Sequence, residues 1–435
     1  MVSAAMYGMY SAGLCVAFGL RLPGILVQAA AHGKYRTGLA ERLGRYHLPP
    51  LGTPIWLHAV SVGEVVAAAP LARALRETRP DCRLLVSTVT ETGRAMARQR
   101  IPEASATVFF PLDFPFAVRR ALDVARPRAV LLAETEIWPN FLRACGARGV
   151  PVAVVNGRIS PRSFRRYRLV RGPFRRVLSH IACFAMQTAA DAERIVALGA
   201  PADRVRVTGN LKFDALAGGQ AVDGRVVRKD LGVEEGRRVL VAGSTHEGEE
   251  VSVVDAFQKL RARRQGSVLV LVPRHPERCG QVEAMLRGQG LSPVRRSAGP
   301  APPGAEVILV DTVGELSRLY AAADVAFVGG SLVPVGGHNI LEAAAAGAPI
   351  IVGPHLQNFA EIASAFQEAG AMLMVQDASE LAAAARKILD DPDRRRDLAA
   401  RAQGVLAAHR GATRRTLDIL APMMGEGGRA GEEGP

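Results

Sequence analysis

Short apolar runs alternate with longer segments of helical pattern along most of this chain, from the Pro49-Pro50 pair onward. The apolar runs are rich in Val, Ile, Leu and Phe, and most of them end in Gly, Ser, Thr or Glu. Segments rich in Ala, Leu and Arg separate them. This alternation is typical of βαβ units, in which parallel strands carry helices on both faces of the sheet. We therefore predict an α/β fold.

The predicted strands fall into two series. The first series comprises residues 55–60, 83–89, 107–110, 129–134, 151–156, 181–187 and 204–209. The second comprises residues 238–243, 267–273, 306–311, 324–330 and 349–353. Residues 213–236 have more Gly and charge and little pattern, so we predict an inter-domain linker there. The expected architecture is two Rossmann-like halves facing a cleft, with ligands beyond the carboxyl ends of the strands.

The length of 435 residues fits two or three domains at roughly 100–200 residues each. We predict four segments with these boundaries: a hydrophobic membrane-associating segment at 1–35, an N-terminal Rossmann-like domain at 36–212, a C-terminal Rossmann-like domain at 213–424, and a tail at 425–435. The tail reads GEGGRAGEEGP and has little apolar content, so we expect it to be disordered.

The N-terminal stretch from Met1 to Leu20 has no charged side chain and approaches the ~20 residues that a membrane-crossing helix needs. Several Gly, Ala and Ser residues make it only moderately apolar, so a buried core helix is the alternative. A basic segment before the apolar run is missing, which favours anchoring over export. Basic residues begin at Arg21, which places the rest of the chain on the cytoplasmic side by the positive-inside rule.

Composition narrows the possible partners. Lys and Arg number 55 against 41 Asp and Glu, a net charge of +14 that favours nucleic acid, anionic lipid or phosphorylated small molecules. Aromatic residues are only 5%, and no nucleic-acid-binding motif is present, which argues against nucleic acid. Five scattered cysteines without a CxxC pair argue against a disulfide framework or zinc module and favour a reducing compartment. No GxGxxG follows a predicted strand and no P-loop motif occurs, which argues against a dinucleotide oxidoreductase or a P-loop NTPase.

Glu64 is a candidate general base because it follows the first predicted strand and opens a helix. The simpler interpretation is helix capping, since Ser61 and Glu64 have the S-x-x-E spacing of a capping box. A helix N-terminus lowers the pKa of a carboxyl group, so a catalytic role requires a dry pocket or a neighbouring carboxylate. Glu134 and Glu136 at the end of a later strand could supply one, and strand alternation would send both to one face. Pairing with nearby arginines is their structural alternative.

A strongly basic segment follows these acids. From Ile137 to Ala190 there is no acidic residue and there are ten arginines, among them Arg158, Arg162, Arg165 and Arg166. Aromatic and aliphatic residues are interspersed with them, so we expect a surface for a lipid phosphate rather than a merely solvated face. Glu136 and these four arginines are our candidates for the acceptor side and the membrane-facing side.

Further candidates follow later strands. Lys212 ends the first half, where a solvated side chain is the alternative. In the second half, Ser244 and the Pro273-Arg274 pair lie in strand-end loops suited to phosphate. A Gly-rich turn then precedes His338 and Asn339 at a helix start, with Glu342 positioned to accept from ribose hydroxyls. Together these patterns predict a nucleotide site in the second half.

Read together, these motifs resemble the 3-deoxy-D-manno-octulosonic acid (Kdo) transferases of lipopolysaccharide assembly, from about residue 20 to 420. The matching segments, in order, are WLHAVSVGE, TVTETG, ETEIWPN, NGRIS, GNLKFD, AGSTHEGEE, VPRHPER, DTVGELSRLY and GGHNILEAAAAGAPIIVGP. The resemblance implies a GT-B architecture at the inner membrane. It also implies CMP-Kdo as donor, the tetraacyl disaccharide lipid A precursor (lipid IVA) as acceptor, and inversion without a metal or other cofactor.

The resemblance also assigns roles to individual residues. Glu64 corresponds to the proton acceptor, and Glu134 and Lys212 to residues that support the transition state. The implied CMP contacts are Pro273, Arg274, Gly314, Glu315, Leu316, Asn339, Ile340, Leu341 and Glu342. Two other interpretations stay open: a GT-B transferase that uses a UDP-sugar, and a basic membrane-surface binding protein without catalysis.

Overall fold

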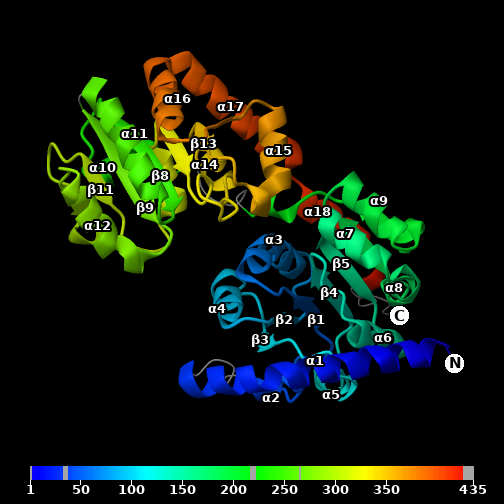
Figure 1. The fold of residues 1–435 in the computed structure, drawn as a ribbon. Helices are drawn as coiled ribbons and strands as arrows, with labels where there is room; N and C mark the ends of the chain where they lie inside the picture. Colours follow the sequence, from blue (N-terminus) through cyan, green and yellow to red (C-terminus); the bar gives the residue numbers. More distant parts are fainter. Residues whose placement is uncertain (1, 33–37, 216–221, 264–265, 425–435) are drawn as a thin grey trace, which may run out of the picture. The chain divides into compact units, whose positions relative to one another are not determined.

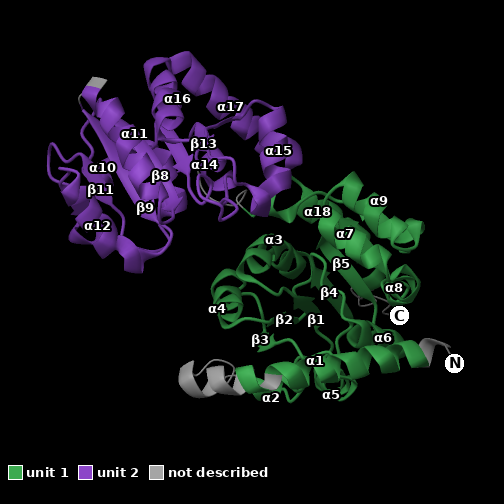
Figure 2. Cartoon of the chain, in the orientation of Figure 1, with its two compact units in different colours: residues 1–215, 410–435 green, residues 216–409 purple. Residues whose placement is uncertain are grey.

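The computed structural model describes residues 2–32, 38–215, 222–263 and 266–424 (Figure 1). The chain divides into two compact units: unit 1 contains residues 1–215 and 410–435, and unit 2 contains residues 216–409 (Figure 2). The expected division at 36–212 and 213–424 therefore differs at the C-terminal end, where the chain returns to unit 1. Met1 and residues 33–35 of the predicted N-terminal segment lie outside the described residues, as does the predicted tail at 425–435.

Unit 1 is built on a seven-stranded sheet in which every neighbouring pair is parallel. In spatial order its strands are β3 (Ala106–Phe109), β2 (Leu84–Thr88), β1 (Ile55–His58), β4 (Ala129–Ala133), β5 (Val152–Gly157), β6 (Cys183–Met186) and β7 (Val205–Val207). All seven correspond to the predicted first series. The strand order reverses between β1 and β4, the point where open α/β sheets bind their ligands.

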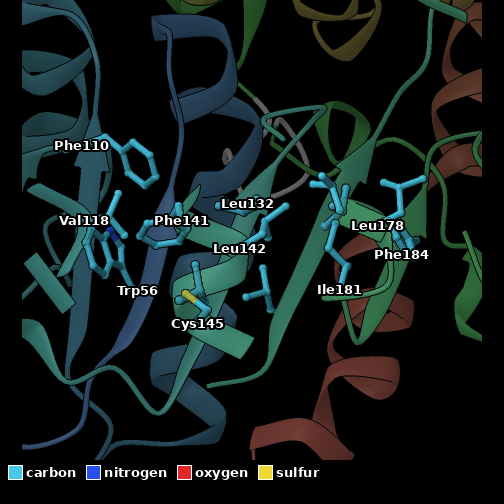
Figure 3. Packing of buried hydrophobic residues seen from close by; sticks show 14 of the residues in the cluster. Trp56, Phe110, Val118, Leu132, Phe141, Leu142, Cys145, Leu178, Ile181 and Phe184 are labelled. Atoms are coloured by element: carbon cyan, nitrogen blue, oxygen red, sulfur yellow. The ribbon is translucent and has the colours of Figure 1, made fainter. Parts of the chain in front are cut away.

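Strand alternation gives this sheet two apolar faces. Trp56 and Leu132 belong to the core cluster on one face, together with Phe141 of a covering helix (Figure 3). Leu57 and Leu131 belong to the cluster on the other face. The helices of unit 1 that follow the first strand are α3 (Val62–Thr78), α4 (Glu91–Arg100), α5 (Pro115–Ala125), α6 (Pro139–Ala147), α7 (Pro161–Arg168), α8 (Arg171–Leu178) and α9 (Ala189–Ala197), with short helices η1 (Ala202–Arg204) and η2 (Leu211–Phe213). Near-continuous apolar strands thus explain a sheet covered on both sides.

The N-terminal helix α1 (Val2–His32) packs along unit 1 beside α6, ahead of the short helix α2 (Leu39–Arg42) (Figure 1). Its Tyr7 is buried in the core cluster and hydrogen-bonds His180 at 3.1 Å, and its Ser11 hydrogen-bonds Asn140. No helix in the described part of the chain is both long and apolar enough to span a bilayer. The membrane anchor therefore stays a prediction. The alternative of a buried core helix fits only in part, because Tyr7 is the one buried residue among the α1 side chains that the structure describes.

The last helix, α18 (Ala412–Leu420), packs against α3 and continues into η7 (Ala421–Met424). Asp214 holds its start, because its carboxylate accepts hydrogen bonds from the backbone N–H groups of Gly411 and Thr413 at 2.8 and 2.6 Å. The acidic residue of the GNLKFD motif thus has a structural role within unit 1.

Unit 2 repeats the parallel design with seven strands. In spatial order they are β10 (Pro293–Arg295), β11 (Val307–Leu309), β9 (Ser267–Pro273), β8 (Arg238–Thr245), β12 (Val325–Val328), β13 (Ile350–Val352) and β14 (Met372–Met374). The predicted second series lacks β10 and β14, which are three-residue strands at the two edges of the sheet. The switch point lies between β8 and β12.

The helices of unit 2 include one inside the predicted linker. They are α10 (Gly224–Leu231), α11 (Glu249–Arg263), α12 (Cys279–Gly288), α13 (Leu316–Leu319), α14 (Leu341–Ala345), α15 (Ala360–Glu368), α16 (Ala378–Asp390) and α17 (Pro392–His409), with short helices η3 (Pro276–Arg278), η4 (Arg296–Ala298), η5 (Tyr320–Ala322) and η6 (Gln357–Phe359). The prediction of a linker over 213–236 was wrong for α10. Arg228 of that helix hydrogen-bonds the carboxylate of Asp324 at 2.7 Å, so α10 is part of the packed unit.

Candidate functional site

In unit 1 the sequence-predicted acids gather at the switch point. Glu64 lies in the first turn of α3, directly after β1, and Glu134 directly follows β4, the strand paired with β1. The carboxyl ends of parallel neighbours share one edge of the sheet, so both side chains come from the edge where ligands bind.

Glu64 makes the capping contacts that its spacing from Ser61 predicts. Its backbone N–H donates to Ser61 Oγ at 3.4 Å, and its Oε2 accepts from the Val60 backbone N–H at 2.8 Å. The Ser61 hydroxyl donates to Glu64 Oε1 at 3.0 Å. These bonds resemble a capping box and fix the carboxylate in one orientation. Only 9% of the residue is exposed, so it lies in the dry surroundings that a base requires.

The pKa of Glu64 is raised from an ordinary value of 4.5 to about 7. Burial is the largest cause, and the negative charges of Glu134 and Glu136 add to it, while the hydrogen bonds from Val60 and Ser61 oppose it. A carboxylate with a pKa near neutrality is a stronger base than an exposed one and is still partly ionised at physiological pH.

Glu134 does not continue its strand as expected. β4 ends at Ala133, and Glu134 has φ +54°, a left-handed conformation that non-glycine residues rarely adopt. Its N–H nevertheless donates to the Val155 carbonyl of β5 at 2.9 Å. The prediction that strand alternation places Glu134 and Glu136 on one face was therefore wrong, because the strand ends before both residues. Burial is the largest cause that raises the pKa of Glu136, and the negative charge of Glu134 adds to it, so the two acids still influence each other.

Lys212 is the positive group of this cluster. Its Nζ lies 3.3 Å from Glu134 Oε1, and both side chains are about one-fifth exposed. Its turn, η2, packs against α3 and is held by Asn156, whose Oδ1 accepts from the Leu211 N–H at 2.9 Å. Asn210 in turn accepts from the Lys212 N–H. The structure thus ties the ETE and GNLK motifs into one charged cluster, and Glu134 pairs with a lysine rather than an arginine.

The basic segment forms α7 and α8 at the surface of unit 1. Arg162, Arg165 and Arg166 are exposed, and within the described residues none of them forms an ion pair. Arg158 precedes α7, and its carbonyl accepts the Thr135 hydroxyl, which links this segment to the ETE loop. Leu169, which follows α7, is 87% exposed. Leu169 and Val170 are thus exposed on the same segment as these arginines, whereas Phe174 is buried and Phe164 and Tyr167 pack against the core. The surface for a lipid phosphate stays a prediction.

In unit 2 the predicted donor residues lie at the carboxyl ends of its strands. Ser244, near the end of β8, has φ +55°, and the Arg274 N–H after β9 donates to the Thr245 carbonyl at 2.9 Å. Pro273 is the last residue of β9. This hydrogen bond holds the loop after β9 beside the end of β8.

The remaining residues that were predicted to bind the sugar-nucleotide donor surround the start of α14. The Ser317 hydroxyl of α13 donates to Glu342 Oε2 at 2.7 Å, and Asn339 donates to Glu342 Oε1 at 3.3 Å. Gly314, Glu315 and Leu316 lead into α13, so that segment and the 339–342 segment meet at Glu342. Ile340 and Leu341 are buried and support the turn.

Two residues of this region were not among the predicted site residues. His246, after β8, hydrogen-bonds His338 through the two Nε2 atoms at 2.8 Å. Glu249 is fully buried, and its carboxylate accepts from four backbone N–H groups, those of His246, Gly330, Ser331 and Leu332. One sequence signal could have identified the hydrogen bond from the His246 N–H to Glu249. The two residues have H-x-x-E spacing after a predicted strand, the spacing found where a helix begins.

Comparisons with known proteins agree with the two-unit fold. Residues 37–215 match the family described as 3-Deoxy-D-manno-octulosonic-acid transferase (kdotransferase), and residues 234–405 match Glycosyl transferases group 1. The chain is 42% identical to a 3-deoxy-D-manno-octulosonic acid transferase of Bordetella pertussis, covering 91% of this chain and 94% of that protein. It is 35% identical to its counterpart in Haemophilus influenzae, with 90% and 92% covered.

A solved structure extends the likeness to the whole fold. The UDP-GlcNAc 2-epimerase of Neisseria meningitidis aligns with 85% of this chain and 99% of its own, with a TM-score of 0.59 at 15% identity. At this identity the match speaks for the fold alone, a GT-B-like pair of parallel-sheet α/β domains.

Proposed function

Because the chain belongs to the 3-deoxy-D-manno-octulosonic acid (Kdo) transferase family and is thus a glycosyltransferase, we propose that it moves Kdo from CMP-Kdo to lipid IVA with inversion. The observation that carries this proposal is the buried Glu64 carboxylate at the switch point of unit 1, with its pKa raised to about 7. The proposed base belongs to unit 1, and the proposed nucleotide-binding residues belong to unit 2.

In the proposed reaction Glu64 takes the proton of the acceptor sugar hydroxyl as that oxygen attacks the anomeric carbon of Kdo. The bond from that carbon to the phosphate oxygen breaks on the opposite face, and its electron pair leaves with CMP. The hydrogen bonds from Val60 and Ser61 keep the carboxylate in place. Burial keeps it basic, so orientation and proton affinity have separate structural causes.

Positive charge near the reaction supports the same proposal. Lys212 lies beside Glu134, so it offsets the charge of the acids around Glu64. Arg274 follows β9 in unit 2, where its guanidinium is suited to a phosphate oxygen. We propose that Arg274 stabilises the leaving phosphate and that transfer proceeds without a metal or other cofactor.

We also propose that unit 1 meets the cytoplasmic leaflet of the inner membrane. Met9, Val16 and Leu20 of α1 are 71%, 63% and 79% exposed, while the opposite side of the helix is packed through Tyr7. The exposed arginines of α7 suit the phosphates of an acylated acceptor. Exchanging Met9, Val16 and Leu20 for Ser should reduce cosedimentation with anionic vesicles, and unchanged binding would contradict the role of α1.

The experiment that tests the function is incubation of the purified protein with lipid IVA and CMP-Kdo generated in situ, followed by mass spectrometry of the lipid. We expect the lipid to gain the mass of one or more Kdo residues. Parallel reactions with UDP-sugars should leave the lipid unchanged. Transfer from a UDP-sugar would refute the proposal. Failure of the intact protein to transfer Kdo from CMP-Kdo would also refute it.

A further inference from the structure

Two histidine rings meet end to end in unit 2. Their planes are 6° from parallel and their centroids are 5.0 Å apart, but the Nε2 atoms of His246 and His338 are only 2.8 Å apart. The facing nitrogens are therefore much closer than the ring centres, as in an N–H···N hydrogen bond and unlike a face-to-face stack. The pair sits at the switch point of unit 2, after β8 and after β12.

The geometry limits this pair to one proton between the two nitrogens. One Nε2 must carry the hydrogen and the other must present its lone pair, because two hydrogens would collide. When the pair gains a proton, the bridge persists and both Nδ1 atoms become N–H donors. The spacing is also too short for a shared zinc ion, whose nitrogen ligands at 2.0–2.1 Å would lie about 3.3 Å apart in tetrahedral geometry.

The surroundings keep the pair neutral. Burial is the largest cause that lowers the pKa of His338, to about 4, and His246, Arg274 and His275 add to it. The pKa of His246 is lowered chiefly by burial, with His275 and Arg274 in the same direction and Glu249 and Glu250 opposed. An anion placed beside the pair would therefore meet neutral imidazoles that gain from protonation.

Glu249 holds the two loops that carry the histidines. Its carboxylate accepts from the His246 N–H at 2.9 Å and from the Gly330, Ser331 and Leu332 N–H groups at 2.6 to 2.9 Å. Gly330 also has φ +65°, and a side chain there would clash with the His338 ring. The pair is therefore set by the fold and is not an accidental meeting of two mobile side chains.

We propose that the His246–His338 pair is the phosphate contact of the nucleotide site and takes up one proton when the phosphate of CMP binds. The proposal rests on the proposed function, because CMP is the leaving group of that reaction. Arg274, on the neighbouring loop, provides the fixed charge. The protonated pair provides a second charge that forms only when the phosphate is present. This second charge would also stabilise the charge that gathers on CMP as it leaves.

The test is calorimetric titration of the full chain with CMP at pH 7.0 and 8.0, in buffers of different ionisation enthalpy. We expect uptake of about one proton per CMP bound at pH 7.0 and a Kd that rises up to about tenfold per pH unit. His246→Gln and His338→Gln, made separately, should each abolish the uptake and flatten the pH dependence. His275→Gln is the matched control, because its ring meets His246 edge-on at 5.6 Å and does not share the bridge.

The outcomes distinguish a wrong donor from a wrong site of proton uptake. If CMP does not bind the wild-type chain at either pH, the proposed donor is wrong. If CMP binds without proton uptake, or if either histidine variant keeps the uptake, the proton does not depend on the bridge and this inference fails while the donor stands. Cytidine, which lacks the phosphate, should bind without proton uptake, and uptake with cytidine would also overturn the inference.

Discussion

Glu64→Gln separates the catalytic role of this residue from its capping role. Glutamine keeps the size of the side chain and one carbonyl oxygen for the Val60 N–H, but it does not accept a proton from an attacking hydroxyl. General base catalysis contributes about 10²- to 10⁴-fold, so we expect the transfer rate to fall within that range. In the wild type the rate should fall as the pH drops below about 7, where Glu64 becomes protonated.

The same substitution should stabilise the protein at high pH. The folded state holds the Glu64 proton up to a pH of about 7, whereas the unfolded state releases it near 4.5. Folded protein therefore binds more protons between these values, so stability falls as the pH rises through that window. At 1.36 kcal/mol per pKa unit the cost reaches about 3 kcal/mol above pH 7. Glutamine does not titrate, so the substitution avoids this loss of unfolding free energy. Losing one hydrogen bond offsets about 1 kcal/mol of that gain.

The assays are Kdo transfer measured by mass spectrometry and urea unfolding at pH 5 and pH 8. We expect a net gain of about 2 kcal/mol in unfolding free energy at pH 8, together with the loss of transfer. Glu77→Gln is the control, because Glu77 lies exposed on the same helix, α3. If Glu64→Gln keeps the wild-type rate, Glu64 is not the base. If it is less stable than the wild type at pH 8, the carboxylate serves chiefly as a cap.

Three further predictions follow from charged contacts. Lys212→Met should lower the transfer rate by about 10²- to 10³-fold and move the pH dependence of that rate to higher pH, since Glu134 loses its positive neighbour; an unshifted profile would contradict the coupling. Asp324→Asn should lower the unfolding free energy of unit 2 by about 3 kcal/mol in urea, because three arginines share that buried carboxylate, and a wild-type midpoint would refute this. Asp214→Asn should weaken the start of α18 by about 1 kcal/mol, detected as faster hydrogen exchange confined to that helix.

The apolar pattern of the chain was sufficient to predict the sheets. Twelve predicted strands correspond to strands of the structure, because a strand buried on both faces needs a nearly continuous apolar run. The strands that were missed, β10 and β14, lie at sheet edges and are three residues long, too short for any pattern. The helix α10 was missed because its charged residues resemble a linker, although Arg228 is bound to Asp324.

The residue types of the acidic cluster were also predictable, but their arrangement was not. Their positions after predicted strands and at the end of the first half identified Glu64, Glu134 and Lys212 as candidates. The left-handed turn at Glu134 and the 3.3 Å ion pair depend on how β4, β5 and η2 pack. The pKa of Glu64 depends on burial, which no local pattern determines.

The order of apolar and polar residues by itself determined two parallel sheets and placed polar side chains at the ends of their strands, because those preferences are local. Only the tertiary structure decided which of these side chains meet. His246 and His338 are separated by 92 positions and come together because β8 and β12 are neighbours in the sheet. The C-terminal helix returns to unit 1 for a similar reason, since Asp214 and the apolar face of α3 hold it there. Contacts between distant segments depend on topology, and topology follows from packing the whole chain.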